Sequence, residues 1–269
     1  MLAVGVDLSA EDLKTWMASV QFLPASANLV SLEAHVANDR MVAAAASATI
    51  LGIDCPFGWP VAFLDFVDEH MRGAVSPRDG PPIDWRRRLA YRETDRFVTR
   101  ETGLRPLSVA ADRIAHAAMR CAALLAELQR AGVEVDRSGI SGKVVEVYPA
   151  ASLARWGLIH RGYKRTENAP RLDDLVTKLR TTAPWLDLGQ FELTCRTNDD
   201  AFDAVIAALS AATASAGLTT PPSGSAIDLA RCEGWIAMPN EGSLPGLLRA
   251  CVAVRQAPRS SQQLLGPDT

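Results

Sequence analysis

Three short apolar segments, each with an acidic residue at or near its end, constrain this chain more than any other feature. They are residues 2–7 (LAVGVD), 49–54 (TILGID) and 143–148 (KVVEVY), and their acids are Asp7, Asp54 and Glu146. A strand buried on both faces of a parallel sheet has this continuous apolar character. A carboxylate in such a strand is costly unless it is paired or binds a metal ion. The three segments therefore predict that their acids gather where the carboxyl ends of the strands meet, which is where open α/β sheets bind ligands.

The overall composition excludes several classes of protein. The chain has 269 residues, of which 48% are hydrophobic and 22% charged, as in ordinary globular proteins. No apolar run approaches about 18 residues, so we expect no membrane span. The N-terminus lacks a signal-peptide pattern, and the five cysteines are scattered without a CxxC pair, so we expect a reduced, cytoplasmic protein. The net charge of -3 leaves nucleic-acid binding to a local patch, if there is one.

Hydrophobic periodicity predicts the order of the strands and helices. Residues 15–22 and 29–36 alternate between apolar and polar side chains, which indicates an antiparallel hairpin. A helix over residues 40–48 then allows the strand at 50–54 to lie parallel to the first strand. Further helices are expected over residues 108–131, 171–183 and 198–216, and a last strand over residues 232–238, with Glu233 as a surface acid.

The last long helix offers another acid to the cluster. Asp200 lies at the start of this helix, where capping and the helix dipole are sufficient to explain an acid. Asp203 lies one turn further in, on the same face as Asp200. Alanines at positions 204, 207, 208 and 211 allow this helix to approach a sheet closely. We therefore expect Asp203 to point at the strands, and we keep Asp200 as the alternative for the same position.

The acids together predict a metal-dependent site. The candidate catalytic residues are Asp7, Asp54, Glu146 and Asp203, and the candidate metal ligands are Asp7, Asp54, Asp200 and Asp203. Such carboxylates repel one another unless they are protonated or neutralised by cations. Ligands that offer only oxygen favour Mg²⁺ or Mn²⁺. Two such ions about 4 Å apart can support hydrolysis of a phosphodiester bond. For Glu146 the alternative is an acid paired with an arginine or lysine on an edge strand.

Arginines in the segment after the second acidic strand form a possible nucleic-acid surface. Residues 61–106 are expected as a helical insertion in which Arg88, Arg92, Arg96 and Arg100 recur every four residues and share one helix face. Such a stripe can neutralise the phosphates of a nucleic acid. The alternative is a solvated face, because nearby acids, Glu93, Asp95 and Glu101, can pair with these arginines. In particular, Arg92 and Asp95 can form an internal pair that orders the insertion.

Several short motifs, taken in order, resemble domain-of-unknown-function family 429. They are Gly5-Val-Asp7, Ile53-Asp54-Cys-Pro-Phe-Gly58, Arg92-Glu-Thr-Asp95-Arg96, Glu146-Val-Tyr-Pro-Ala150, Asp200-Ala-Phe-Asp203-Ala and Glu233-Gly-Trp-Ile236. The resemblance extends from residue 1 to about residue 240, and it implies a ribonuclease H-like fold and nuclease activity. The segment that begins at Asp203 also resembles the final acidic helix of Holliday-junction resolvases in that superfamily.

The sequence thus predicts one α/β domain over residues 1–255. We expect a ribonuclease H-like mixed sheet (an antiparallel hairpin plus parallel strands) flanked by helices, with the helical insertion after the fourth strand and a disordered tail over residues 256–269. The expected function is a Mg²⁺- or Mn²⁺-dependent nuclease that acts on DNA or RNA, with no membrane partner. The alternatives are a non-catalytic scaffold for nucleic acid or protein, and a sugar-kinase-like phosphotransferase. The kinase is disfavoured because the turn after Asp7 has no glycine.

Overall fold

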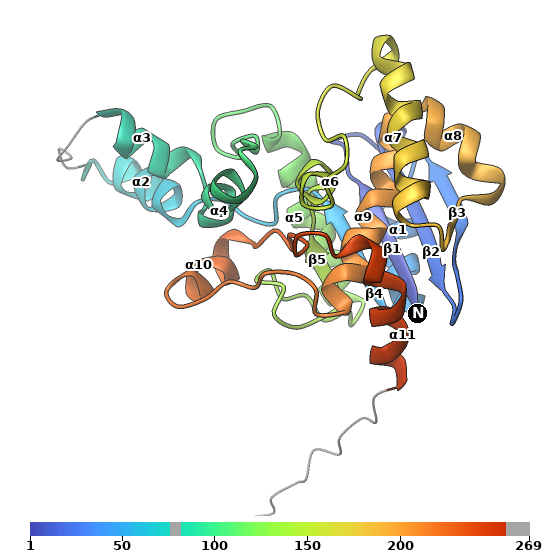
Figure 1. Ribbon diagram of the computed structural model, residues 1–269. Coiled ribbons are helices and arrows are strands. Elements are labelled where there is room, and N and C mark those ends of the chain that lie inside the picture. The colour runs from blue at the N-terminus through green and yellow to red at the C-terminus, as the bar shows by residue number, and fades with distance from the viewer. Residues whose placement is uncertain (76–81, 257–269) are drawn as a thin grey trace, which may run out of the picture.

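A six-stranded mixed sheet forms the centre of the protein (Figure 1). The computed structural model describes residues 1–75 and 82–256, so the predicted tail and most of the predicted loop at 76–82 lie outside the described residues. The order of the strands across the sheet is β5-β4-β1-β2-β3-β6. The strands are β1 (Leu2–Asp7), β2 (Trp16–Phe22), β3 (Ala27–Ala34), β4 (Ile50–Asp54), β5 (Val144–Glu146) and β6 (Leu186–Asp187).

The directions of the strands confirm the predicted combination of hairpin and parallel strands. β1, β2 and β3 pair antiparallel in succession, whereas β4 pairs parallel with β1 and β5 pairs parallel with β4. The two-residue β6, which the sequence did not predict, extends the far edge by pairing parallel with β3. Because β1 and β4 run parallel and in register, their acidic ends lie side by side, with Asp7 opposite Asp54.

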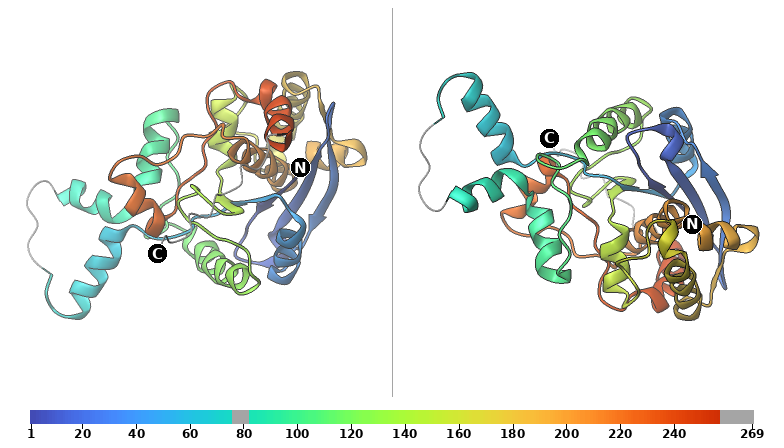
Figure 2. Two further views of the ribbon diagram at one scale, coloured as in Figure 1. Left: turned by 90° about the horizontal axis from the view of Figure 1, so that it is seen from below. Right: turned by 90° about the horizontal axis from the view of Figure 1, so that it is seen from above.

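Helices cover both faces of the sheet (Figure 2). One face carries α1 (Asn38–Ser47) and α5 (Ala115–Arg130), and the other carries α9 (Asp199–Ser215), as the two hydrophobic clusters of the core show. The side with α9 also holds α6 (Pro149–Arg155), α7 (Ala169–Thr182), α8 (Glu192–Thr197) and α11 (Leu247–Gln256). Short 3₁₀ turns occur at Asp12–Lys14, Thr166–Asn168, Gly189–Phe191 and Leu244–Gly246. Within the described part of the chain, no helix is long and apolar enough to span a membrane.

Three helices that follow β4 in the chain lie to one side of the sheet, at the left of Figure 1. They are α2 (Val61–Met71), α3 (Pro82–Ala90) and α4 (Glu93–Thr102). The late helix α10 (Ala226–Glu233) packs against both α2 and α4, although more than 100 residues separate α10 from either helix in the sequence. The region that the sequence predicts as an insertion is thus held by a segment from near the end of the described chain.

Two glycines allow α9 to lie directly on the sheet. Gly5 in β1 and Gly52 in β4 are neighbours in the parallel register. A Cβ atom added at Gly5 would lie 2.1 Å from the backbone nitrogen of Ala208, and one added at Gly52 would lie 2.7 Å from the carbonyl oxygen of Ala207. A side chain at either position would therefore push α9 away. The same contact determines how far the first turns of α9 reach over the ends of the strands.

Two of the predicted elements are corrected by the structure. Residues 232–238 do not form a strand, because α10 continues to Glu233 and ends where Gly234 takes a φ of 89°. The following residues pair with β5 only through an isolated bridge at Ile236. The helix predicted over 108–131 begins at Ala115, because the preceding residues form a separate turn. In this turn the backbone nitrogen of Ser108 donates a hydrogen bond to the Asp112 side chain, and the backbone nitrogen of Asp112 donates to the carbonyl oxygen of Ser108.

Candidate acidic site

Three aspartates meet where β1, β4 and α9 come together. Each of Asp7, Asp54 and Asp203 offers one carboxylate oxygen, and these three oxygens lie within 4.8 Å of one another. Asp7 and Asp54 are adjacent because their strands are parallel and in register, and Asp203 joins them because α9 lies on Gly5 and Gly52. Asp200, one turn earlier on α9, is not part of this group, and neither is Glu146. The roles of these residues as catalytic groups or metal ligands stay a prediction.

The aspartates at the strand ends are electrostatically unsatisfied. Burial raises the pKa of Asp54 to about 7, and the neighbouring Asp203 and Glu146 act in the same direction against the opposing effect of Lys164. Burial, together with the charges of Asp203 and Asp54, also raises the pKa of Asp7 well above its usual range. Among the described residues, no hydrogen bond or ion pair reaches the side chain of Asp7 or Asp54. Burial and mutual repulsion therefore disfavour the ionised form of both aspartates.

Asp203 is fully buried and is held by two consecutive residues of a loop. The hydroxyl of Tyr163 donates a hydrogen bond of 2.8 Å to Oδ1 of Asp203. The ammonium of Lys164 lies 2.5 Å from Oδ2, although no donor reaches this oxygen in hydrogen-bonding geometry. The charge of Asp203 raises the pKa of Lys164, so the ammonium keeps its proton. The sequence reasoning missed Tyr163 and Lys164, because residues 160–170 have no periodic pattern and were expected only as loop.

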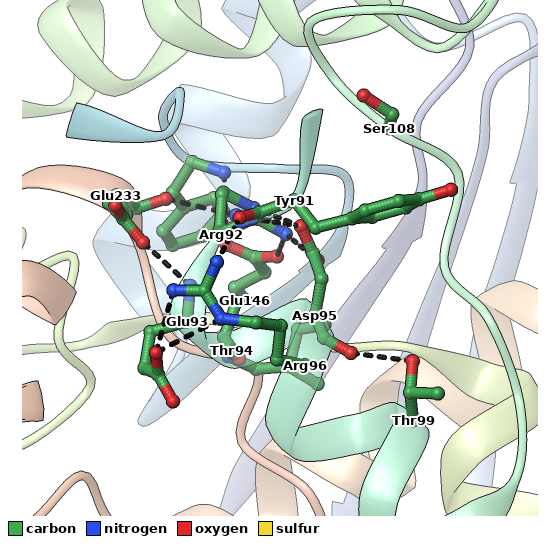
Figure 3. Close-up of polar contacts among 12 residues, drawn as sticks. Tyr91, Arg92, Glu93, Thr94, Asp95, Arg96, Thr99, Ser108, Glu146 and Glu233 are labelled. Atoms are coloured by element: carbon green, nitrogen blue, oxygen red, sulfur yellow. Dashed lines mark hydrogen bonds and ion pairs between the residues drawn. The ribbon is translucent and has the colours of Figure 1, made fainter. Parts of the chain in front are cut away.

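Glu146 belongs to a second buried cluster centred on Arg92 (Figure 3). The guanidinium of Arg92 donates to both carboxylate oxygens of Glu146, at 2.7 and 2.9 Å, and to both of Asp95, at 2.9 and 3.1 Å. The Arg92 side chain is only 2% exposed. The structure therefore shows Glu146 as an acid paired with an arginine on an edge strand, and it confirms the internal pair of Arg92 with Asp95.

This buried cluster joins the end of β4 to the helices beside the sheet. Oε2 of Glu146 accepts a 3.0 Å hydrogen bond from the backbone nitrogen of Phe57, in the loop directly after Asp54. The carboxylate of Glu233 accepts from the first backbone nitrogens of two helices, Val61 of α2 at 2.9 Å and Glu93 of α4 at 2.7 Å. Glu233 is 3% exposed, so the expectation of a surface acid is wrong. Both glutamates act as anchors for the loop and helices that surround Asp54.

The acidic site opens into a cavity of about 300 Å³. Its lining includes the three aspartates together with Lys164, Glu146 and Arg92. Backbone segments on either side of the site complete the wall, including residues 106–107 before α5 and residues 147–150 after β5. The cavity therefore gives a small charged ligand direct access to the three carboxylates.

The predicted stripe of four arginines on one helix is wrong. The chain breaks between α3 and α4, because Arg92 is extended (φ −68°, ψ 165°) and its backbone nitrogen donates to the side chain of Asp95, which begins the new helix. Arg92 points into the protein and is unavailable to a nucleic acid. Arg96 pairs with the partly buried Glu93 at 2.7 Å and Arg100 with the exposed Glu101 at 3.5 Å, in agreement with the alternative of a solvated face.

Six arginines of α3, α4 and the segment after α4 line a second cavity. This hollow of about 750 Å³ lies between α3 and α4. Within the described ranges, Arg88 and Arg105 form no ion pair. The chain then passes from Arg105 directly to Pro106 and Leu107, which line the acidic cavity, so the two hollows are neighbours. The arginines that line the larger cavity are Arg86, Arg87, Arg88, Arg96, Arg100 and Arg105.

Comparison with known proteins gave one match. The sequence model of a family described as "Protein of unknown function (DUF429)" matches residues 5–226, a range that contains the three aspartates and Lys164, and also Arg92 with Asp95 and Glu146. No match was found among curated proteins or among solved structures.

Proposed function

This chain belongs to the DUF429 family, and we propose that it is a metal-dependent nuclease with a ribonuclease H-like fold that hydrolyses phosphodiester bonds. The observation that carries the proposal is the meeting of Asp7, Asp54 and Asp203, whose carboxylate oxygens lie within 4.8 Å at the carboxyl ends of two parallel strands. The antiparallel β1–β3 unit, the parallel β4 and β5 and the late acidic helix α9 support the assignment of the fold.

The residues at this site fit a hard divalent cation. The donor set consists of carboxylate oxygens, which favour Mg²⁺ or Mn²⁺. Oδ2 of Asp203 is buried and receives no hydrogen bond in suitable geometry, although the ammonium of Lys164 lies 2.5 Å from it, and Asp7 and Asp54 have no side-chain partner in the described structure. Burial and the neighbouring carboxylates raise the pKa values of Asp7 and Asp54 in spite of the nearby Lys164. A bound cation would therefore relieve repulsion that the protein itself leaves in place.

Each group in the cavity has a place in this chemistry. When bound, Mg²⁺ or Mn²⁺ would lower the pKa of a water molecule and stabilise charge on the phosphate. Asp7, Asp54 and Asp203 would hold the cation, and Glu146, which is already occupied by Arg92 and Phe57, would fix the loop after Asp54. Glu146 is thus a positioning residue in this proposal, not a ligand.

The arginine-lined cavity supports a polynucleotide as the substrate. Six arginines face a hollow that adjoins the acidic cavity along residues 105–107. Contacts between arginines and phosphates provide affinity that is independent of base sequence. A strand whose backbone lies in the larger hollow would extend towards the three carboxylates.

The proposal is tested by incubating the purified protein with labelled single-stranded and duplex DNA and RNA in Mg²⁺, Mn²⁺ or EDTA. We expect cleavage with either metal and none in EDTA, and we expect Asp54→Asn and Asp203→Asn to abolish it. Asp65→Asn, on the exposed surface of α2, is the matched control and should cleave like wild type. An absence of cleavage of all substrates in both metals would refute nuclease activity.

The arginine surface is tested by binding in the absence of divalent metal. The double variant Arg88→Ala/Arg96→Ala should bind oligonucleotides more weakly, with the slope of log affinity against log salt reduced by about one unit per lost phosphate contact. The control is Arg40→Ala, because Arg40 is an exposed arginine that also pairs with an acid, Glu33, at 2.6 Å, but has no place in the arginine cavity. Equal salt slopes for the double variant and wild type would exclude this surface.

A non-catalytic scaffold is the second candidate, and the ion pair between Lys164 and Asp203 is the observation that favours it. An ammonium already neutralises one carboxylate of the cluster without a metal ion. Oligonucleotide or protein binding that is unaffected by EDTA, together with no turnover, would favour this function over the nuclease.

A further inference from the structure

Lys164 enters the acidic site from a loop and comes closer to it than any other cation in the described chain. Its Nζ lies 2.5 Å from the buried Oδ2 of Asp203, and its side chain lines the cavity shared by Asp7 and Asp54. The other cation that lines this cavity, Arg92, is already bound to Asp95 and Glu146. The Lys164 side chain is half exposed, so it faces both the carboxylates and the open side of the cavity.

The backbone next to Lys164 is held in an unusual conformation. Arg165 has a φ of 77° and a ψ of 153°, a region in which almost only glycine is found. On the other side of Lys164, Tyr163 is 1% exposed and its hydroxyl is bound to Asp203. The backbone nitrogen of Arg165 donates to Asp199 at 3.2 Å, at the start of α9. Contacts to α9 on both sides thus hold the lysine over the cluster against local strain.

We propose that Lys164 is a functional residue that provides one of the two cations of this site, so that the carboxylate cluster binds one divalent ion and not two. This inference rests on the proposed metal-dependent function. Three ionised carboxylates are neutralised by one ammonium and one divalent ion, whereas a second divalent ion would leave excess positive charge. In this proposal one divalent ion and Lys164 take the place of the two ions expected from the sequence.

The position of Lys164 also gives it a contact with the substrate. Its half-exposed side chain lines the cavity that would receive the scissile phosphate, so its ammonium can donate to a phosphate oxygen while it remains beside Asp203. An ammonium is a compact charge with three donors, so it can serve both anions at the same time.

The number of bound ions tests this inference without nucleic acid or turnover. Metal-free full-length protein is titrated with Mn²⁺, and free Mn²⁺ is measured by electron paramagnetic resonance. We expect one ion per chain for wild type, two for Lys164→Met, and one for Lys164→Arg, which keeps the charge. We also expect the first ion to bind Lys164→Met at least about tenfold more tightly, because a nearby positive charge has been removed. Lys178→Met, an exposed lysine on α7, is the matched control and should behave like wild type.

The outcomes separate this inference from the proposed function. Two ions in wild type, or an unchanged single ion with unchanged affinity in Lys164→Met, would overturn the role of Lys164 and leave a metal-dependent nuclease intact. No Mn²⁺ binding by wild type at millimolar concentration would overturn both. Urea unfolding of each variant verifies that it is folded. If Lys164→Met does not fold, the number of ions bound by Lys164→Arg still tests the inference, because two ions in this variant would contradict it.

Discussion

Replacement of Asp54 by asparagine should stabilise the metal-free protein at alkaline pH and not at acidic pH. Because the pKa of Asp54 is raised from 3.8 to about 7, the folded protein holds a proton between these values that the unfolded chain has released. The free energy of unfolding therefore falls as the pH rises through this range and becomes constant above about pH 7. Above about pH 7, ionisation of Asp54 therefore lowers the free energy of unfolding by about 4 kcal/mol, at about 1.4 kcal/mol per pKa unit.

Asparagine removes this cost but leaves an amide in the same place. A buried polar group without a partner costs about 1–3 kcal/mol, and no hydrogen bond reaches the Asp54 side chain from the described residues. The two effects should roughly cancel at pH 5, where most of the cost of ionisation is absent. At pH 8 we expect Asp54→Asn to be more stable than wild type by about 2 kcal/mol.

The measurement is urea unfolding of both proteins in EDTA at several values between pH 5 and pH 8.5, with Asp65→Asn as the control. Saturating Mn²⁺ should then stabilise wild type by about 2.7 kcal/mol at a hundredfold excess over Kd, but not Asp54→Asn. The reasoning is refuted if Asp54→Asn loses the same stability at every pH. That result would make Asp54 a structural hydrogen-bond partner.

The remaining predictions concern the packing that builds the site, and each is measured by urea unfolding. Gly52→Ala should lower the free energy of unfolding by about 3 kcal/mol, because the added Cβ would lie 2.7 Å from a carbonyl oxygen of α9. The control Gly246→Ala should change stability little, because nothing lies within 4 Å of its added Cβ, and equal effects of the two substitutions would contradict the close contact. Arg92→Met should lower the free energy of unfolding by about 3–5 kcal/mol, because it leaves buried carboxylates unpaired. The control Arg40→Met removes an exposed ion pair and should lower the free energy of unfolding by only about 0–1 kcal/mol. Arg165→Gly should gain about 1 kcal/mol by removing backbone strain, and a loss would show that this conformation is not strained.

The alternation of side chains was sufficient to predict the central strands. β1 and β4 are continuous apolar runs because both faces are covered. The alternation of β2 and β3 predicted strands but not their buried face, because β2 is buried along most of its length and β3 buries Leu29 while Val30 is 53% exposed. The composition of α9, with its series of alanines, predicted a helix lying on a sheet, and an acid one turn inside it had to point at the strands. These are local properties, so the sequence placed Asp7, Asp54 and Asp203 among its candidates, but it did not separate them from Asp200 and Glu146.

Other features depend on contacts between distant residues and left no local signal. Lys164 lies in a loop without periodicity, and its position beside Asp203 exists only because Tyr163 and Arg165 attach that loop to α9. Arg92 has the spacing of a surface stripe, yet it is buried because Glu146, 54 residues away, offers it a carboxylate. The sequence thus determined β1 to β5 and most of the long helices, because these follow from local periodicity, but it missed β6 and predicted a strand where α10 ends. Only the tertiary structure decided which charges meet, because the energy of a buried charge depends on partners from other parts of the chain.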